Sequence, residues 1–132
     1  TLSADTISSI TDRVLPEITA WKSRMEQNQR FPMDEYIGIH PEAPQSFGNF
    51  LRQRIFDKVP FKTVNYLNGQ AENLEEECKR YSELLLRHPV DIVCLGIGEN
   101  GHIAFNDPDV ANFNDSHLVK VVELDPNVAS NK

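Results

Sequence analysis

The sequence predicts an α/β fold with a three-layer, largely parallel sheet flanked by helices. Apolar residues recur at helical spacing in residues 5–27 and 73–87. Residues 90–97 (VDIVCLGI) are a nearly continuous apolar run of strand length, which is typical of a strand buried on both faces. A loop rich in glycine and titratable residues, 96–108, then follows where ligands bind in such sheets. Together these features indicate a Rossmann-like architecture.

Composition is that of an ordinary globular protein. The chain has 132 residues, of which 39% are hydrophobic and 25% charged, so we expect one domain over 1–132. Its formal charge of −7 disfavours nucleic acid and anionic membranes as partners. The apolar runs are too short to span a bilayer. Cys78 and Cys94 sit in apolar patterns and form no C-x-x-C pair, which favours reduced core thiols and a cytoplasmic location.

The first forty residues divide into a helix, a connector and an extended segment. The helical pattern of residues 5–27 contains Pro16, which should kink or split it. Residues 27–32 are polar and end in proline, so they read as a connector. Residues 33–39 (MDEYIGI) should be short and extended before the Pro-rich loop at 40–44.

A second helix is expected to start at Ser46, which can serve as its N-cap. Its apolar face would hold Phe47, Phe50, Leu51 and Ile55. Residues 63–67 read as a short strand, and Asn68-Gly69 is a strong turn signal.

The clearest predicted helix covers residues 73–87. Asn73 is its expected cap, and negative charge in the first turn suits the helix dipole. The apolar face comprises Leu74, Cys78, Tyr81 and Leu85. Residues 117–124 (HLVKVVEL) are a further strand candidate.

The glycine loop invites a dinucleotide-binding interpretation. Gly96, Gly98 and Gly101 match G-x-G-x-x-G after a buried strand, and Glu123 lies about twenty residues further on. That fingerprint needs a helix opening at the third glycine, whereas Pro108 interrupts soon after it. We therefore expect no nicotinamide or flavin cofactor. A tight turn that needs glycines for backbone reasons is the simpler alternative.

His102 and Asp107 are the candidate acid/base residues of the loop. An imidazole and a carboxylate on one loop at a strand end can move protons near neutral pH. A metal centre is not expected, because no ligand spacing relates the four histidines His40, His88, His102 and His117.

Two motifs give the chain a specific resemblance. GIGENGHIAFNDP (96–108) is similar to the signature loop of the glucosamine-6-phosphate deaminase (isomerase) family. MDEYIGI followed by HPEAPQSF resembles that family's second signature, and YLNG, an acidic helix and VDIVCLGIG follow in the family's order. The resemblance covers about residues 31–125. It implies conversion of glucosamine 6-phosphate and water to fructose 6-phosphate and ammonia.

The resemblance also implies roles for individual residues. Asp34 would move the C2 proton, and His102 would assist ring opening together with Asp107 and Asn100. Many family members have Asp where Asn100 stands and Glu where Asp107 stands. An amide can orient the imidazole by a hydrogen bond but cannot stabilise its positive charge. The expected substrate-binding residues are Gly98, Gly101 and Lys132.

The phosphate-binding region is the main departure from the family pattern. Residues 1–30 contain no glycine and read as a helical segment that does not match the family, so no glycine-rich cradle is found there. Lys132 is the remaining basic candidate. Two alternatives stay open: a non-catalytic relative or fragment that binds sugar phosphate or a partner, and a phosphogluconolactonase-like hydrolase. The sequence is also compatible with a homo-oligomer.

Overall fold

The computed structural model describes Ala20 and residues 28–124. Within these residues the chain divides into two compact units, 28–31 with 51–65 and 32–50 with 66–124. The helix predicted at 5–27 and the phosphate candidate Lys132 lie outside the described residues, except that Ala20 is helical.

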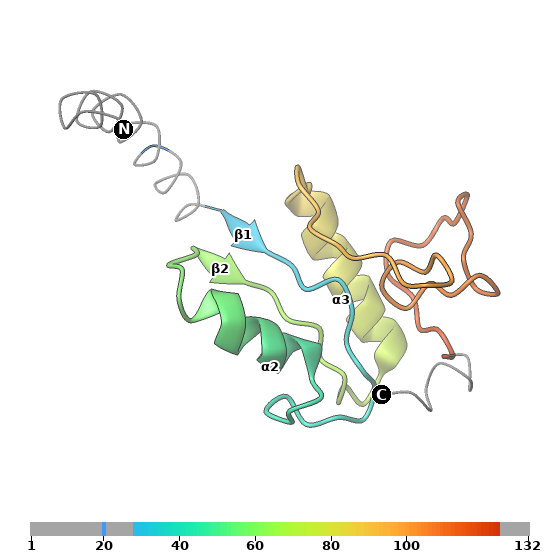
Figure 1. The fold of residues 1–132 in the computed structure, drawn as a ribbon, viewed down its shortest axis with the longest axis horizontal. Coiled ribbons are helices and arrows are strands. Elements are labelled where there is room, and N and C mark those ends of the chain that lie inside the picture. Colours follow the sequence, from blue (N-terminus) through green and yellow to red (C-terminus); the bar gives the residue numbers. More distant parts are fainter. Residues whose placement is uncertain (1–19, 21–27, 125–132) are drawn as a thin grey trace, which may run out of the picture. The chain divides into compact units, whose positions relative to one another are not determined.

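The first unit contains a small parallel sheet. Strand β1 (Gln29–Arg30) lies beside strand β2 (Thr63–Val64), as Figure 1 shows. The strand predicted at 63–67 is therefore confirmed over its first two residues, where β-branched side chains favour extended backbone.

Strand β1 corrects the sequence analysis, which predicted a connector at 27–32. Its polar residues are held by interactions that apolar patterning cannot reveal. The Asn65 amide donates to Gln29 Oε1 at 3.0 Å, and Asn65 N donates to Arg30 O at 2.9 Å. The Arg30 guanidinium carbon lies 4.3 Å from the centre of the Phe61 ring, a cation–π distance.

The second predicted helix forms, and Ser46 caps it as expected. Helix α2 (Phe47–Leu51) continues into a π-helical segment, η1 (Arg52–Phe56). Ser46 Oγ accepts a hydrogen bond from Asn49 N at 3.1 Å, and Ser46 is only 1% exposed.

Helix α3 (Leu74–Arg87) matches the prediction for 73–87 almost to the residue. Asn73 Oδ1 accepts from two backbone N–H groups of the first turn, those of Glu75 and Glu76. Tyr81 is 2% exposed, and its hydroxyl donates to Pro32 O at 2.7 Å. Burial raises the pKa of Tyr81. This contact ties α3 to the chain just before the MDEY segment.

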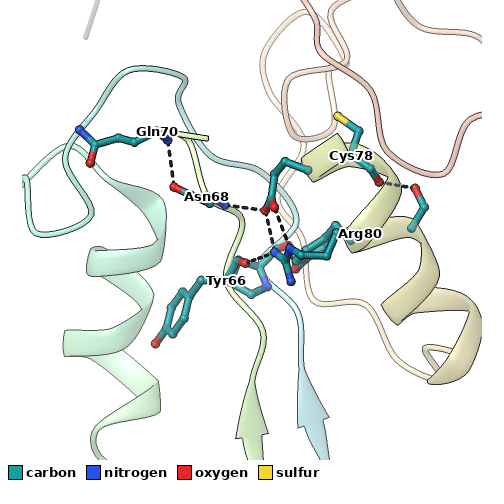
Figure 2. Close-up of polar contacts among 9 residues, drawn as sticks. Tyr66, Asn68, Gln70, Cys78 and Arg80 are labelled. Atoms are coloured by element: carbon teal, nitrogen blue, oxygen red, sulfur yellow. Dashed lines mark hydrogen bonds and ion pairs between the residues drawn. The ribbon is translucent and has the colours of Figure 1, made fainter. Parts of the chain in front are cut away.

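An ion pair on α3 also holds the predicted Asn68-Gly69 turn. Glu77 pairs with Arg80 at 2.6 Å and accepts from Asn68 N at 2.8 Å, while Arg80 donates to Tyr66 O at 3.0 Å. Figure 2 shows this network reaching from the helix to the loop. The hydrogen bond from Arg80 lowers the pKa of Glu77 below its usual value.

The strands predicted at 90–97 and 117–124 are not formed. The described backbone after α3 runs through turns and bends to residue 124 without a strand (Figure 1). Ile92 is 80% exposed and Ile97 71% exposed. A strand buried on both faces needs a hydrogen-bonded neighbour and a covering layer, and the described residues supply neither to this run.

The two cysteines are free, as expected, but neither lies in a core. Cys78 is half-buried on α3, and Cys94 is exposed because the apolar run around it is uncovered. Among the described residues, no helix is long and apolar enough to cross a membrane.

Candidate functional site

Three side chains of the glycine loop form one hydrogen-bonded chain. His102 Nδ1 lies 2.6 Å from Asn100 Oδ1, and Asn100 Nδ2 donates to Asp107 Oδ1 at 3.1 Å. The direct distance from His102 Nδ1 to Asp107 Oδ1 is 3.5 Å. The imidazole therefore meets the carboxylate mainly through the amide. We call these three side chains the imidazole relay.

The backbone fixes the orientation of the relay. Asn100 Oδ1 also accepts from the backbone N–H of His102 at 3.1 Å, so this atom must be the amide oxygen. His102 Nδ1 must then carry the hydrogen that it shares with Asn100. Nε2 is left as the nitrogen that can accept a proton from a ligand.

Burial suits the two ends of the relay to different roles. The Asp107 side chain is 7% exposed, whereas that of His102 is 28% exposed. A buried carboxylate with an amide donor is held in place, and a partly exposed imidazole can reach a substrate. The predicted grouping of Asn100, His102 and Asp107 thus has the geometry of a supported acid/base group.

Glycines give the loop its shape around His102. A Cβ on Gly98 would overlap the His102 ring, so only glycine allows the ring to lie there. Gly101 has φ of +86°, a conformation that favours glycine. Gly98 N donates to His102 O and Gly101 N donates to Gly98 O, each at 2.9 Å. Both N–H groups are thus used to build the turn.

Glu35 is a site residue that the sequence analysis did not single out. Its Oε1 accepts from the backbone N–H groups of Tyr36 at 2.9 Å and Phe47 at 3.1 Å. Its Oε2 accepts from the Ser46 hydroxyl at 2.7 Å and from Gly48 N at 2.9 Å. One carboxylate therefore joins the MDEY segment to the start of α2. Glu35 lies eleven residues before the serine that caps α2, and no local sequence pattern predicts a contact over that separation.

Aromatic rings bring the two sequence motifs together. The Tyr36 ring stacks on Phe47 at 5.2 Å and lies 4.9 Å from Phe105, between centroids. Phe47 and Phe105 also meet edge to face at 5.6 Å. Asp34, which is half-buried, precedes Tyr36 by two residues, and His102 precedes Phe105 by three. The segment of the expected proton carrier and the loop of the imidazole relay are thus neighbours in one compact unit.

The described residues contain no group of three or more His, Cys, Asp or Glu side chains that could hold a metal ion. After Gly101 the described chain forms turns and no helix, so the helix of a dinucleotide fingerprint does not follow the third glycine.

Comparison with known proteins matches residues 6–130 to the family described as glucosamine-6-phosphate isomerases/6-phosphogluconolactonase. A glucosamine-6-phosphate deaminase of Lactobacillus delbrueckii is 41% identical over 107 residues, which is 81% of this chain and 46% of that protein. One from Streptococcus pyogenes is 47% identical over 92 residues, 69% of this chain and 39% of that protein. The chain spans about half the length of the curated relatives that it matches.

A solved structure shows the same similarity in three dimensions. It is that of a monomeric glucosamine-6-phosphate deaminase described as a missing link of the NagB superfamily, with a TM-score of 0.68 and 32% identity. The match covers 92% of this chain and 51% of that one. Together with the parallel β1–β2 pair and the helices, it confirms the predicted α/β, Rossmann-like fold class.

Proposed function

Because the chain belongs to the family of glucosamine-6-phosphate isomerases and 6-phosphogluconolactonases, we propose that it carries the acid/base groups of a glucosamine-6-phosphate deaminase. The reaction converts glucosamine 6-phosphate and water to fructose 6-phosphate and ammonia. The observation that supports this most is the imidazole relay lying on a loop in ring contact with the MDEY segment.

Ring opening is the proposed role of the imidazole relay. The cyclic sugar opens when a proton leaves the anomeric hydroxyl and another reaches the ring oxygen. His102 Nε2 accepts the first proton and returns it to the ring oxygen, because Nδ1 is already engaged with Asn100. Asp107 supports the transient imidazolium through the Asn100 amide and from 3.5 Å.

Asp34 is the proposed proton carrier for the isomerisation. It takes the C2 proton of the open-chain amino sugar and delivers a proton to C1. A second proton passes from the amino nitrogen to the C1 oxygen, so that C1 becomes a hydroxymethyl group and C2 an imine. Water then adds at C2 and ammonia leaves, so the atoms of the overall reaction balance. The Asp34 carboxylate is half-buried and lies two residues before Tyr36, whose ring belongs to the aromatic cluster, so it can be held within reach of the C2 proton.

Substrate binding is proposed for Gly98, Gly101 and Lys132. Gly98 leaves room for the His102 ring, the space that a Cβ on Gly101 would take is open, and Lys132 would pair with the phosphate. The proposed partner is an amino-sugar phosphate in the cytoplasm, without a cofactor and without nucleic acid or membrane.

The direct test is ammonia release from glucosamine 6-phosphate by the complete gene product. We expect turnover with this sugar and none with 6-phosphogluconolactone. Hydrolysis of the lactone without ammonia release would favour the lactonase alternative. Binding of glucosamine 6-phosphate without turnover of either compound would favour a non-catalytic relative.

A further inference from the structure

We propose that Glu35 is a positioning residue for the proton carrier Asp34 and for the loop of His102. This inference rests on the proposed function, and it concerns a residue that the family motif contains but that no proposed chemical step uses. Glu35 acts through its neighbours and touches no reacting atom.

The contacts of Glu35 are unusually complete for a half-buried carboxylate. Four donors surround its two oxygens: the backbone N–H groups of Tyr36, Phe47 and Gly48, and the hydroxyl of Ser46. Hydrogen bonds to an ionised acceptor are about twice as strong as neutral ones. The 35–36 peptide is thereby fixed against the first turn of α2.

Asp34 is fixed by the same contact, because it precedes Glu35 in the chain. A second constraint acts on the other side of the motif. A Cβ on Gly69 would overlap the carbonyl oxygen of Tyr36, and Gly38 N donates to Gly69 O at 2.8 Å. The backbone that carries Asp34 is therefore held on one side by α2 and on the other by the Asn68-Gly69 turn.

The effect of Glu35 extends to the imidazole relay through Phe47. Glu35 binds the backbone N–H of Phe47, whose ring contacts Tyr36 and Phe105. Phe105 lies between His102 and Asp107 in the sequence. One carboxylate thus sets the position of both segments that we assign to the chemistry.

Glu35→Gln in the complete protein tests this role. The amide retains one acceptor oxygen, so it cannot serve both donor pairs, and two of the four hydrogen bonds are lost. We expect kcat for ammonia release to fall by about 10- to 100-fold, which is the loss expected when a catalytic group is displaced by about an ångström. KM should change by less than about threefold.

Asp115→Asn is the matched control. Asp115 is also a half-buried carboxylate with charge-assisted hydrogen bonds, from Lys120 and from the backbone N–H of His117, but it is not part of the MDEY segment. We expect its substitution to leave kcat within about twofold of wild type.

Gly48→Ala is a second variant that keeps the charge. Its Cβ would lie 3.1 Å from Glu35 Oε2 and 3.1 Å from Tyr66 Cδ1, so the carboxylate must move by a few tenths of an ångström. We expect a several-fold loss of kcat at unchanged KM. If Glu35→Gln does not fold, this variant still tests whether the position of the Glu35 carboxylate affects kcat.

Crystal structures of wild type and of the two amide variants, Glu35→Gln and Asp115→Asn, give a readout that needs no turnover. We expect the Asp34 carboxylate to be displaced in Glu35→Gln and unmoved in Asp115→Asn. An unmoved Asp34 with unchanged kcat in Glu35→Gln, or equal kcat losses in the two amide variants, would overturn the positioning role. Absence of ammonia release from wild type would instead reject the proposed function, and the crystal structures would still decide the role of Glu35.

Discussion

His102 depends on an uncharged neighbour for its orientation. In the imidazole relay the Asn100 amide oxygen accepts from the ring and from the backbone N–H of His102, and its nitrogen donates to Asp107. Exchanging the two ends of the amide would lose the hydrogen bonds to that N–H and to Asp107. Asn100 therefore fixes the tautomer of the ring, while Asp107 supplies the only negative charge of the relay. This arrangement differs from one with two carboxylates, because less charge stabilises the imidazolium.

Gly98→Ala should disrupt this orientation without changing any polar group. The added Cβ would occupy the space of the His102 ring, so the ring must rotate away from Asn100. We expect kcat to fall by at least about tenfold, because proton transfer depends on the direction in which the imidazole Nε2 points. Steady-state kinetics of ammonia release measure the effect.

Gly96→Ala is the control for this substitution, because a Cβ there meets nothing within 4 Å. Its kcat should stay within about twofold of wild type. Equal activity of the two alanine variants would contradict the claim that Gly98 makes room for the His102 ring.

At the level of single residues, sequence reasoning found what lies close in the chain. Asn100, His102 and Asp107 fall within eight residues, and the relay joins them as a group. Glu35 was missed because three of its four partners lie eleven to thirteen residues away across a loop, and no spacing rule connects them. The roles of Asp34 and Lys132 stay predictions.

Helix α3 is docked through one ion pair and one tyrosine hydroxyl. Glu77 and Arg80 hold Asn68 and Tyr66 against the helix, and the Tyr81 hydroxyl holds Pro32. Figure 2 shows Arg80 of the helix next to Tyr66 and Asn68 of the loop. The turn that supports the MDEY segment is therefore attached to α3 by hydrogen bonds from a charged pair.

Stability should depend on pH through Glu77. Its folded-state pKa is lowered from 4.5, mainly by the hydrogen bond from Arg80, so its contribution is present above about pH 4.5 and is lost as pH falls through the lowered pKa. We expect Glu77→Gln to lower the free energy of unfolding by about 1 kcal/mol at pH 7, a modest amount because Arg80 is 47% exposed and its charge is partly screened. At pH 3 the loss should be much smaller. Denaturant unfolding at the two pH values measures the difference.

Glu83→Gln is the control, because the Glu83–Arg87 pair is 3.6 Å apart with both side chains more than half exposed. It should change stability by less than about 0.5 kcal/mol at either pH. A cost of Glu77→Gln that stays constant or grows toward pH 3 would contradict the assigned contribution.

Elements with local signals were predicted well, and those that need a partner were not. The boundaries of α3 follow from a capping asparagine and an amphipathic pattern that lie within the helix itself. Strand β1 escaped prediction because Gln29 and Arg30 are held by Asn65 and Phe61 rather than by burial. The apolar run 90–97 has strand composition, yet a strand forms only where a neighbouring strand is present.

For the whole molecule, the order of motifs proved more informative than composition. The family resemblance drawn from the two signatures is confirmed by the family match over residues 6–130 and by relatives at 41% and 47% identity. Composition and charge limited the class of partner but did not indicate a sugar phosphate. The MDEY segment and the glycine loop are in contact through the ring of Phe105, which belongs to the signature loop but was assigned no role from the sequence.

We propose that these two segments form one acid/base site, with Asp34 as the carrier of the C2 proton. Exchange of that proton with deuterated water, followed by NMR on glucosamine 6-phosphate with the complete protein, tests this assignment. Asp34→Asn should abolish exchange while sugar-phosphate binding stays within about threefold of wild type, because loss of a base affects the transition state more than the ground state. Exchange at the wild-type rate, or equal loss of binding and exchange, would contradict the account.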